Sequence, residues 1–247
     1  MTPSGTRASR LQRWVASMLL VLCAAPATAM GDEDRYWALV VDQLEHRWQE
    51  GADSLRWDLE GWFGGDTNRL WWRAEGDSRT QGGSGGEFEL HVFYARHVSA
   101  YWDFLVGARQ DVVFGPGRNR ERTYAVLSLE GLAPYRAELE PSLFVADDGD
   151  VSLRLTATTD LYVTQRLIAQ PRFEINVAAD DAREFGVRSG VNDVELGLRL
   201  RYEIRREVAP YVGVSWLRRI GSTAELARAR GEGKQDLAFV AGVRFWF

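Results

Sequence analysis

Residues 237–247 read LAFVAGVRFWF, and the alternation within this stretch decides the expected fold. Apolar side chains recur at every second position from Leu237 to Phe247, while Gly242 and Arg244 lie among the positions between them. Successive side chains of a β-strand point to opposite faces of a sheet. The stretch therefore predicts a β-strand with one continuous apolar face, and that face includes the final phenylalanine.

The same alternation runs through most of the chain. Leu55–Phe63, Val151–Leu161 and Val194–Ile204 carry apolar residues on one face and mainly charged or hydroxyl side chains on the other. About twelve such segments can be drawn, each near the length of a tilted membrane strand, and an even number suits a closed bacterial barrel. The segments are residues 39–48, 54–63, 69–76, 86–97, 101–112, 121–132, 135–146, 150–162, 166–178, 192–205, 210–218 and 236–247.

The connections between these segments favour a membrane barrel over a soluble one. Short connections such as Gly64–Asn68 and Glu207–Ala209 alternate with longer ones such as Asp77–Gly85 and Ala179–Val191. That pattern is typical of outer-membrane barrels with both termini in the periplasm. A soluble β-sandwich or lipocalin-like barrel would also alternate, but its apolar face would point inward. The apolar repeat ending at Phe247 resembles the terminal signal of barrels inserted into the outer membrane. We therefore expect an all-β, transmembrane, antiparallel up-and-down β-barrel in the outer membrane.

The N-terminal residues have the pattern of an export signal. Three arginines between residues 7 and 13 precede the apolar run Trp14–Ala25, and Ala27–Ala29 has the small–x–small form of a cleavage site. We expect residues 1–29 to be a cleaved signal peptide, residues 30–38 a short periplasmic segment and residues 39–247 the barrel. Cys23, the single cysteine, would leave with the signal peptide.

The charged face of the strands is expected to line the inside of the barrel. A formal net charge of −5 argues against a nucleic-acid-binding surface. Buried charges persist only when they are paired or hydrated, so the interior is either a packed ion-pair network or a small polar pore. The expected interior residues are Asp58, Glu60, Arg73, Glu75, Glu87, Glu89, Asp103, Arg109, Arg136, Glu138, Glu140, Arg154, Arg172, Glu174, Glu195, Arg199, Arg201, Glu203 and Arg244.

Aromatic residues are frequent, at 12% of the chain, and many lie near the ends of the expected strands. Tryptophan and tyrosine are enriched where a membrane meets water, so an interfacial girdle explains them; a carbohydrate-stacking surface is the alternative. The aromatic residues assigned to the girdle are Trp48, Trp62, Trp71, Trp72, Tyr101, Trp102, Tyr135, Tyr162 and Tyr211.

One histidine is a candidate metal ligand. By parity, His91 shares the polar face with Glu87 and Glu89, and an imidazole beside carboxylates can bind a divalent ion such as Cu²⁺. The alternative is an ordinary hydrogen-bonded lumen residue. Of the other two histidines, His46 is expected at the outer rim beside Trp48 and His97 at a periplasmic turn.

Two further features bear on fold and catalysis. Pro171 lies inside an expected strand, where it removes a backbone donor, so a bulge or local break is expected there. The chain has no His-Glu-x-x-His motif, and its Gly-x-Ser-x-Gly match at residues 82–86 lies at an expected connection between two strands. A lipid-acting enzyme would need a Ser–His pair on the lipid-facing side, for which only His46 is placed, with no evident serine partner. We therefore expect no enzymatic activity.

The chain resembles the copper resistance protein B family of Gram-negative outer membranes over nearly its whole mature length. The stretches GGDTNRLW (residues 64–71) and LRYEIRRE (residues 200–207) are the most specific matches. The matching blocks are Asp42–Glu45, Trp57–Asp66, Asn68–Trp71, Tyr94–Asp111, Gly131–Tyr135, Asp160–Val177, Ser189–Trp216 and Phe239–Phe247.

The resemblance implies an outer-membrane protein of copper tolerance that binds copper. Members commonly carry a Met- and His-rich segment before the barrel, whereas here Met30 is the one soft ligand between the expected cleavage site and the first strand. If the protein handles copper, it would do so through the barrel, an extracellular loop or a partner such as a periplasmic multicopper oxidase. The alternatives are a general small-solute pore or structural barrel without a metal role, and an enzyme acting on the surrounding lipid.

Overall fold

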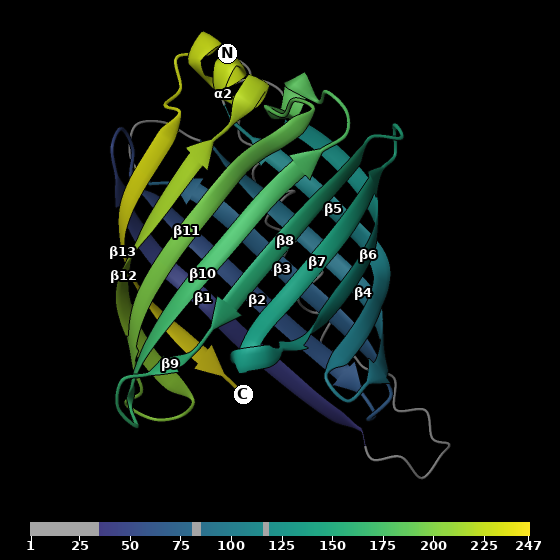
Figure 1. Cartoon of the computed structure of the whole chain (residues 1–247), viewed down its shortest axis with the longest axis vertical. Coiled ribbons are helices and arrows are strands. Elements are labelled where there is room, and N and C mark those ends of the chain that lie inside the picture. Colours follow the sequence, from purple (N-terminus) through teal and green to yellow (C-terminus); the bar gives the residue numbers. More distant parts are fainter. Residues whose placement is uncertain (1–34, 81–84, 116–118) are drawn as a thin grey trace, which may run out of the picture. The chain divides into compact units, whose positions relative to one another are not determined.

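The computed structural model describes residues 35–80, 85–115 and 119–247 (Figure 1). The expected signal peptide lies outside the described residues. The described part contains thirteen strands and one α-helix. The strands are β1 (Tyr36–Gln49), β2 (Ser54–Gly64), β3 (Asn68–Arg79), β4 (Gly86–Ser99), β5 (Trp102–Phe114), β6 (Arg120–Ala133), β7 (Ala137–Ala146), β8 (Val151–Thr159), β9 (Leu161–Tyr162), β10 (Leu167–Ala178), β11 (Gly190–Tyr202), β12 (Val208–Arg219) and β13 (Gln235–Trp246).

The strands close into a barrel. Neighbours along the chain pair antiparallel, and β1 pairs with both β2 and β13, which closes the sheet. The short β9 continues the line of β8, since both pair with β10. Counted with β8 and β9 as one strand position, the barrel therefore has twelve strands around its circumference, which confirms the expected number and topology. The first strand begins at Tyr36, three residues before the expected barrel boundary.

The break expected at Pro171 is present between β8 and β9. Arg172 pairs with Thr158 of β8 and Ala169 pairs with Leu161 of β9, but no pairing is recorded for Pro171 on this side. A proline has no backbone N–H to donate to the neighbouring strand. On the other side Pro171 stays in register with Leu198 of β11, so β10 itself is continuous through Pro171 and the interruption lies in the neighbouring strand.

The two faces of the sheet have opposite character. Along β11, Leu198 is 49% exposed while the adjacent Arg199 is 3% exposed, and Leu196 and Leu200 repeat the pattern of Leu198. In a closed sheet the exposed apolar side chains form the outer surface, and the buried charged ones fill the lumen. This is the arrangement expected of a barrel surrounded by lipid, because lipid offers no partner for a charge.

The barrel has two structurally different ends. We call the end where β1 begins and β13 finishes the terminal end; it lies at the bottom of Figure 1 and carries short turns. We call the opposite end the loop end. It carries the longer connections, including helix α2 (Gly221–Ala229), whose Thr223 donates a hydrogen bond to Asn192 of β11. None of the helices in the described residues is long and apolar enough to cross a bilayer.

Part of the lumen is apolar, which the alternation did not predict. The buried residues Trp71, Phe93, Ala95, Leu105, Val126 and Phe144 form one cluster on β3–β7, with Trp62 and Tyr124 packed against it. Trp71 and Tyr211 are only 7% and 5% exposed, so their assignment to an interfacial girdle was wrong. Both lie on the inward face, where tyrosine and tryptophan pack against other side chains instead of lipid.

A β-bulge at Asp42 changes which residues of β1 face inward. The register with β2 passes from Val41–Leu59 to Gln43–Asp58, so Asp42 is one extra residue. Asp42 and Gln43 therefore both reach the lumen: Asp42 accepts a hydrogen bond from Arg244, and Gln43 accepts one from Arg199. A bulge interrupts strict alternation in this way.

Candidate metal centre in the barrel lumen

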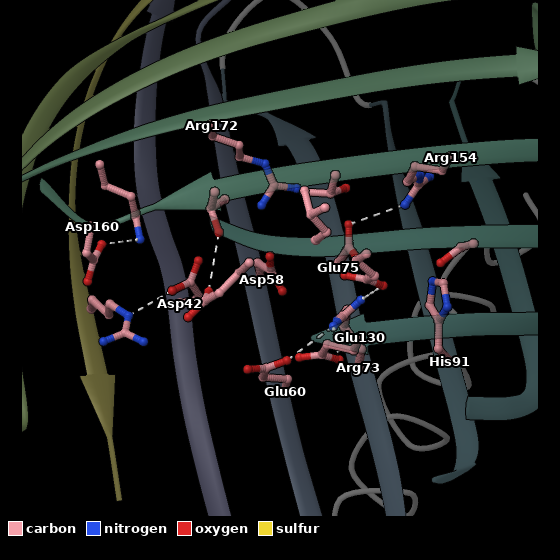
Figure 2. A pocket seen from close by; sticks show the side chains of 18 of the residues that line it. Asp42, Asp58, Glu60, Arg73, Glu75, His91, Glu130, Arg154, Asp160 and Arg172 are labelled. Atoms are coloured by element: carbon pink, nitrogen blue, oxygen red, sulfur yellow. Dashed lines mark hydrogen bonds and ion pairs between the residues drawn. The ribbon is translucent and has the colours of Figure 1, made fainter. Parts of the chain in front are cut away.

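A cavity of about 140 Å³ lies in the lumen, toward the terminal end (Figure 2). Its position follows from its lining, since Glu138 is the second residue of β7 and Asp160 directly follows β8. We call it the acidic cavity. Its ionisable lining consists of Asp42, Asp58, Glu60, Glu75, Glu130, Glu138, Glu140, Asp160, His91, Arg73, Arg154, Arg172 and Arg244.

Carboxylates outnumber arginines in this cavity by eight to four. Arg73 is shared among Glu60 (3.3 Å), Glu130 (3.5 Å) and Glu140, so one cation serves three carboxylates. Arg244 pairs with Asp42 at 2.8 Å. A concave site with an excess of one charge, enclosed by low-dielectric walls, concentrates ions of the opposite charge. The acidic cavity is therefore suited to attract cations.

The register of neighbouring strands places four carboxylates in one row across the sheet. Asp58 of β2 is directly opposite Glu75 of β3, Glu75 is opposite Glu89 of β4, and Glu89 is opposite Asp111 of β5. We call these four residues the carboxylate row. His91 lies two residues after Glu89 on the same face of β4, so the β3–β4 hairpin brings Glu75, Glu89 and His91 together.

These three residues form a group that could hold a metal ion. One ligand atom from each of Glu75, Glu89 and His91 lies within 4.8 Å of the others. His91 is 2% exposed, and neither of its ring nitrogens makes a hydrogen bond. Its Nε2 atom is 3.5 Å from Glu89 Oε2. A buried polar atom without a hydrogen bond is costly, so His91, which has this longer contact with Glu89 in place of a hydrogen bond, is the feature that marks the site.

Of the three expected metal ligands, the structure brings His91 and Glu89 together and leaves Glu87 apart from them. Glu87 is an exposed residue near the start of β4, opposite Asp77 of β3 and Val113 of β5. Glu75 takes the place beside His91 that the sequence analysis gave to Glu87. The β3–β4 hairpin was the sequence feature that could have identified Glu75 as a ligand, because the register of β3 against β4 places Glu75 opposite Glu89.

The other two histidines lie near connections at opposite ends of the barrel, His46 beside Trp48 as expected. The ring of His46 packs edge-on against Trp48 at 4.7 Å and lies 3.7 Å from Asp53, near the connection between β1 and β2. Within the described residues, no hydrogen bond joins His46 to a serine, as a lipid-acting Ser–His pair would need. His97 contacts Asp103 at 2.9 Å near the turn between β4 and β5.

Glu89 also belongs to a dense set of ion pairs. Arg109 Nη2 lies 2.9 Å from Glu89 and also donates to Asp111 at 2.6 Å. Arg154, which comes from β8, donates to Glu89 at 3.2 Å and lies 3.7 Å from Glu75. The carboxylates of the candidate site are thus held by guanidinium groups in this structure.

A second ionic region joins β1, β2, β11 and β12. Arg199 donates two hydrogen bonds of 2.9 Å to Glu45, which is fully buried, and Tyr211 donates a third at 3.1 Å. On the same side of the lumen, Arg47 and Arg56 reach Glu195 at 3.4 and 3.1 Å. We call this region the seam network; its residues are Gln43, Glu45, Arg47, Arg56, Glu195, Arg199, Tyr211 and Ser215.

Two expected lumen residues lie elsewhere, and several lumen residues were not expected. Arg136 and Glu203 are in turns at the terminal end, because β6 finishes at Ala133 and β11 at Tyr202. Asp42, Glu45 and Arg47 were absent from the expected interior because the bulge in β1 breaks its alternation. The expected ion-pair filling is present together with the acidic cavity.

The donor atoms present favour one oxidation state of copper. Imidazole and carboxylate suit Cu²⁺, whereas Cu⁺ prefers thiolate or thioether sulfur. The cysteine and the three methionines of the chain all fall within residues 1–30, so residues 35–247 offer no sulfur ligand. The group of Glu75, Glu89 and His91 therefore fits Cu²⁺.

Solved structures with the same architecture define the class of protein. A KdgM porin matches with a TM-score of 0.52, 11% identity, and coverage of 84% of this chain and 98% of that one. A NanC porin matches with a TM-score of 0.57, 14% identity and the same two coverages. These likenesses concern the fold. With its lipid-suited outer surface, the chain is an outer-membrane β-barrel.

Sequence comparisons then give the family. The family model described as copper resistance protein B precursor matches residues 35–247. Copper resistance protein B of Escherichia coli is 39% identical over 89% of this chain and 72% of its own length. A copper resistance protein B homolog of Pseudomonas syringae pv. tomato is 43% identical over 84% of this chain and 69% of its own length. The chain belongs to the copper resistance protein B family, which supports a role in copper resistance at the outer membrane.

Proposed function

We propose that the barrel contributes to copper resistance by binding Cu²⁺ reversibly in its lumen, at Glu75, Glu89 and His91. The observation that carries this proposal is the state of His91, which is buried, makes no hydrogen bond through either ring nitrogen, and faces two carboxylates. A metal ion would satisfy all three side chains at once. The acidic cavity beside them would raise the local cation concentration.

The proposal includes an orientation in the membrane. The terminal end, which holds the acidic cavity, would face the periplasm, and the loop end with α2 would face the outside. Copper would then reach the site from the periplasmic side, or leave toward it. A periplasmic multicopper oxidase, the partner that the family resemblance implies, would act on the same side.

Titration of Cu²⁺ into the purified, refolded barrel tests the site. We expect His91→Ala to weaken binding by about ten-fold or more, a loss of ~1.4 kcal/mol. The matched control is His97→Ala, which removes an imidazole that also contacts a carboxylate but lies outside the candidate site. Electron paramagnetic resonance of the bound Cu²⁺ should report one nitrogen ligand in the wild type and none in His91→Ala.

Both variants must first be shown to fold, for which the gel-mobility difference between folded and heat-denatured barrels is sufficient. Equal Cu²⁺ affinity in the wild type and His91→Ala would remove the proposed site. In that case a conductance measurement in planar bilayers would separate a general small-solute pore from a silent structural barrel.

A further inference from the structure

The carboxylate row creates an electrostatic problem that the barrel must solve. Asp58, Glu75, Glu89 and Asp111 lie directly opposite one another on four successive strands, and strands in a sheet are only about 4.8 Å apart. Like charges placed directly opposite across strands destabilise a sheet. The middle pair, Glu75 and Glu89, therefore needs a cation close to both carboxylates.

In this structure that cation is the guanidinium of Arg154. The residue comes from β8, which pairs with β7 and β10 and not with β3 or β4, so its side chain reaches Glu75 and Glu89 through space inside the lumen. Its Nη1 atom lies 3.7 Å from Glu75 Oε2, and its Nη2 atom donates to both oxygens of Glu89 at 3.2 Å. Figure 2 shows Arg154 above Glu75, with His91 beside them.

Arg154 thus holds the same two carboxylates that, with His91, form the candidate metal site. Two cations cannot both occupy that position, because they would repel each other and compete for the same oxygens. A second set of acceptors for Arg154 exists on β10. Its Nε atom donates to Asn176 at 3.2 Å and lies 3.8 Å from Glu174 Oε1.

We propose, on the basis of the function proposed above, that Arg154 is an internal counter-ion that a divalent cation displaces when it binds to Glu75, Glu89 and His91. On displacement the guanidinium moves from Glu75 and Glu89 toward Glu174 and Asn176. When the ion leaves, Arg154 returns and neutralises the two carboxylates again. The site is therefore never left with unpaired buried charge, and the affinity for the ion is lowered by the competition.

This arrangement explains how an acidic site in a lumen can remain reversible. Without a competing cation, two carboxylates and an imidazole would retain Cu²⁺ for a long time, and an empty site would be unstable. With Arg154 present, binding exchanges one cation for another. The exchange suits transient binding of an ion in passage better than storage.

The test compares Cu²⁺ affinity and stability in Arg154→Gln, Arg154→Lys and Arg244→Gln. Arg154→Gln should bind Cu²⁺ about ten-fold more tightly than the wild type, since the competitor is gone. Arg154→Lys keeps the charge and should stay close to the wild type. Arg244→Gln removes an equal charge from the cavity lining, but Arg244 pairs with Asp42 at 2.8 Å and with neither Glu75 nor Glu89, so the gain should be much smaller.

Stability gives a second readout. Arg154→Gln leaves Glu75 without its ion-pair partner and Glu89 with Arg109, so without metal it should unfold at a lower denaturant concentration than the wild type. Saturating Cu²⁺ should restore it, because a ligand that binds only the folded state stabilises that state. Arg244→Gln should show no comparable rescue.

The outcomes separate the two proposals. Weaker or unchanged binding by Arg154→Gln, in a protein whose binding is lost in His91→Ala, overturns the counter-ion role and leaves the metal site standing. An equal gain in Arg244→Gln also overturns it, since net charge alone would then explain the effect. Absence of Cu²⁺ binding in both the wild type and Arg154→Gln defeats the site and the counter-ion together.

Discussion

The seam network and the acidic cavity are both built from charged side chains inside one barrel, yet they differ in charge balance and in access to water. Glu45 in the seam network is fully buried and its oxygens are occupied by Arg199 and Tyr211. In the acidic cavity the side chain of Glu60 is 26% exposed and shares Arg73 with two other carboxylates. A buried network with a cation for every carboxylate fixes structure, whereas a water-accessible one with an excess of carboxylates leaves charge available for an ion.

The largest difference should appear in stability. Removing one member of a buried ion pair leaves its partner charged and unpaired, at a cost of about 3–5 kcal/mol. We therefore expect Glu45→Gln to lower the free energy of unfolding by that amount, because Arg199 keeps its buried charge. Glu138→Gln in the acidic cavity should cost less than about 1 kcal/mol. Denaturant unfolding of both variants in lipid vesicles measures the contrast, and similar losses would contradict the distinction drawn between the two regions.

A smaller effect is expected on the rate of ion binding. Replacing Glu60, Glu130 and Glu138 together by glutamine should slow Cu²⁺ association about ten-fold at low salt, with little change in dissociation, because the cavity charge attracts the ion. The difference should shrink as ionic strength rises. Stopped-flow mixing measures both rates.

The matched control for that experiment replaces Glu184, Glu225 and Glu232 by glutamine. These three carboxylates are exposed and lie in the connections at the loop end, so the net charge changes equally. Slower association in this control and not in the cavity variant would place ion entry at the loop end and reverse the proposed direction of access.

The smallest effect concerns an ion pair between the buried Arg122 of β6 and the exposed Asp148. Arg122 donates hydrogen bonds to Asp148 in the β7–β8 turn at 2.5 and 2.7 Å, and these hold the pKa of Asp148 below its ordinary value of 3.8. A lowered pKa means that the contact stabilises the folded state above that value and is lost as the pH falls below it. Exposed pairs contribute at most about 1 kcal/mol.

Hydrogen exchange of the β7–β8 turn checks this expectation. Asp148→Asn at neutral pH should lower the protection of the turn amides, relative to an unstructured chain at the same pH, to the level that the wild type shows in acid. Asp53→Asn, in the β1–β2 connection, serves as the control and should leave the β7–β8 turn unchanged.

Much of the barrel could be predicted from the sequence because alternation reports directly which face a residue occupies. The alternation in Val194–Ile204 and Leu237–Phe247 predicted both strands. The parity of Leu198 and Arg199 predicted that Leu198 faces outward and Arg199 faces the lumen. Alternation fails where the backbone departs from regular geometry, as at the bulge of Asp42. Alternation also does not predict which apolar residues, such as Trp71, face inward, because an aromatic side chain fits lipid and lumen equally well.

The candidate metal site could be predicted only in part for a related reason. Parity placed His91 and Glu89 on one face of one strand, which is local information. Glu75 joins them through the register of two strands, and Arg154 joins them across the lumen from β8. Those contacts depend on strand pairing and barrel closure, which no single segment encodes.

The closure between β1 and β13 has a consequence for biogenesis. The final residue, Phe247, exchanges backbone hydrogen bonds with Leu39, and Asp42 meets Arg244 across 202 positions of the chain. Joining such distant segments is the slow part of forming a closed sheet. Until β13 of the nascent polypeptide has paired with β1, Asp42 has no ion pair with Arg244. Assembly therefore has to keep the unfinished sheet hydrated on its concave side until the final strand arrives.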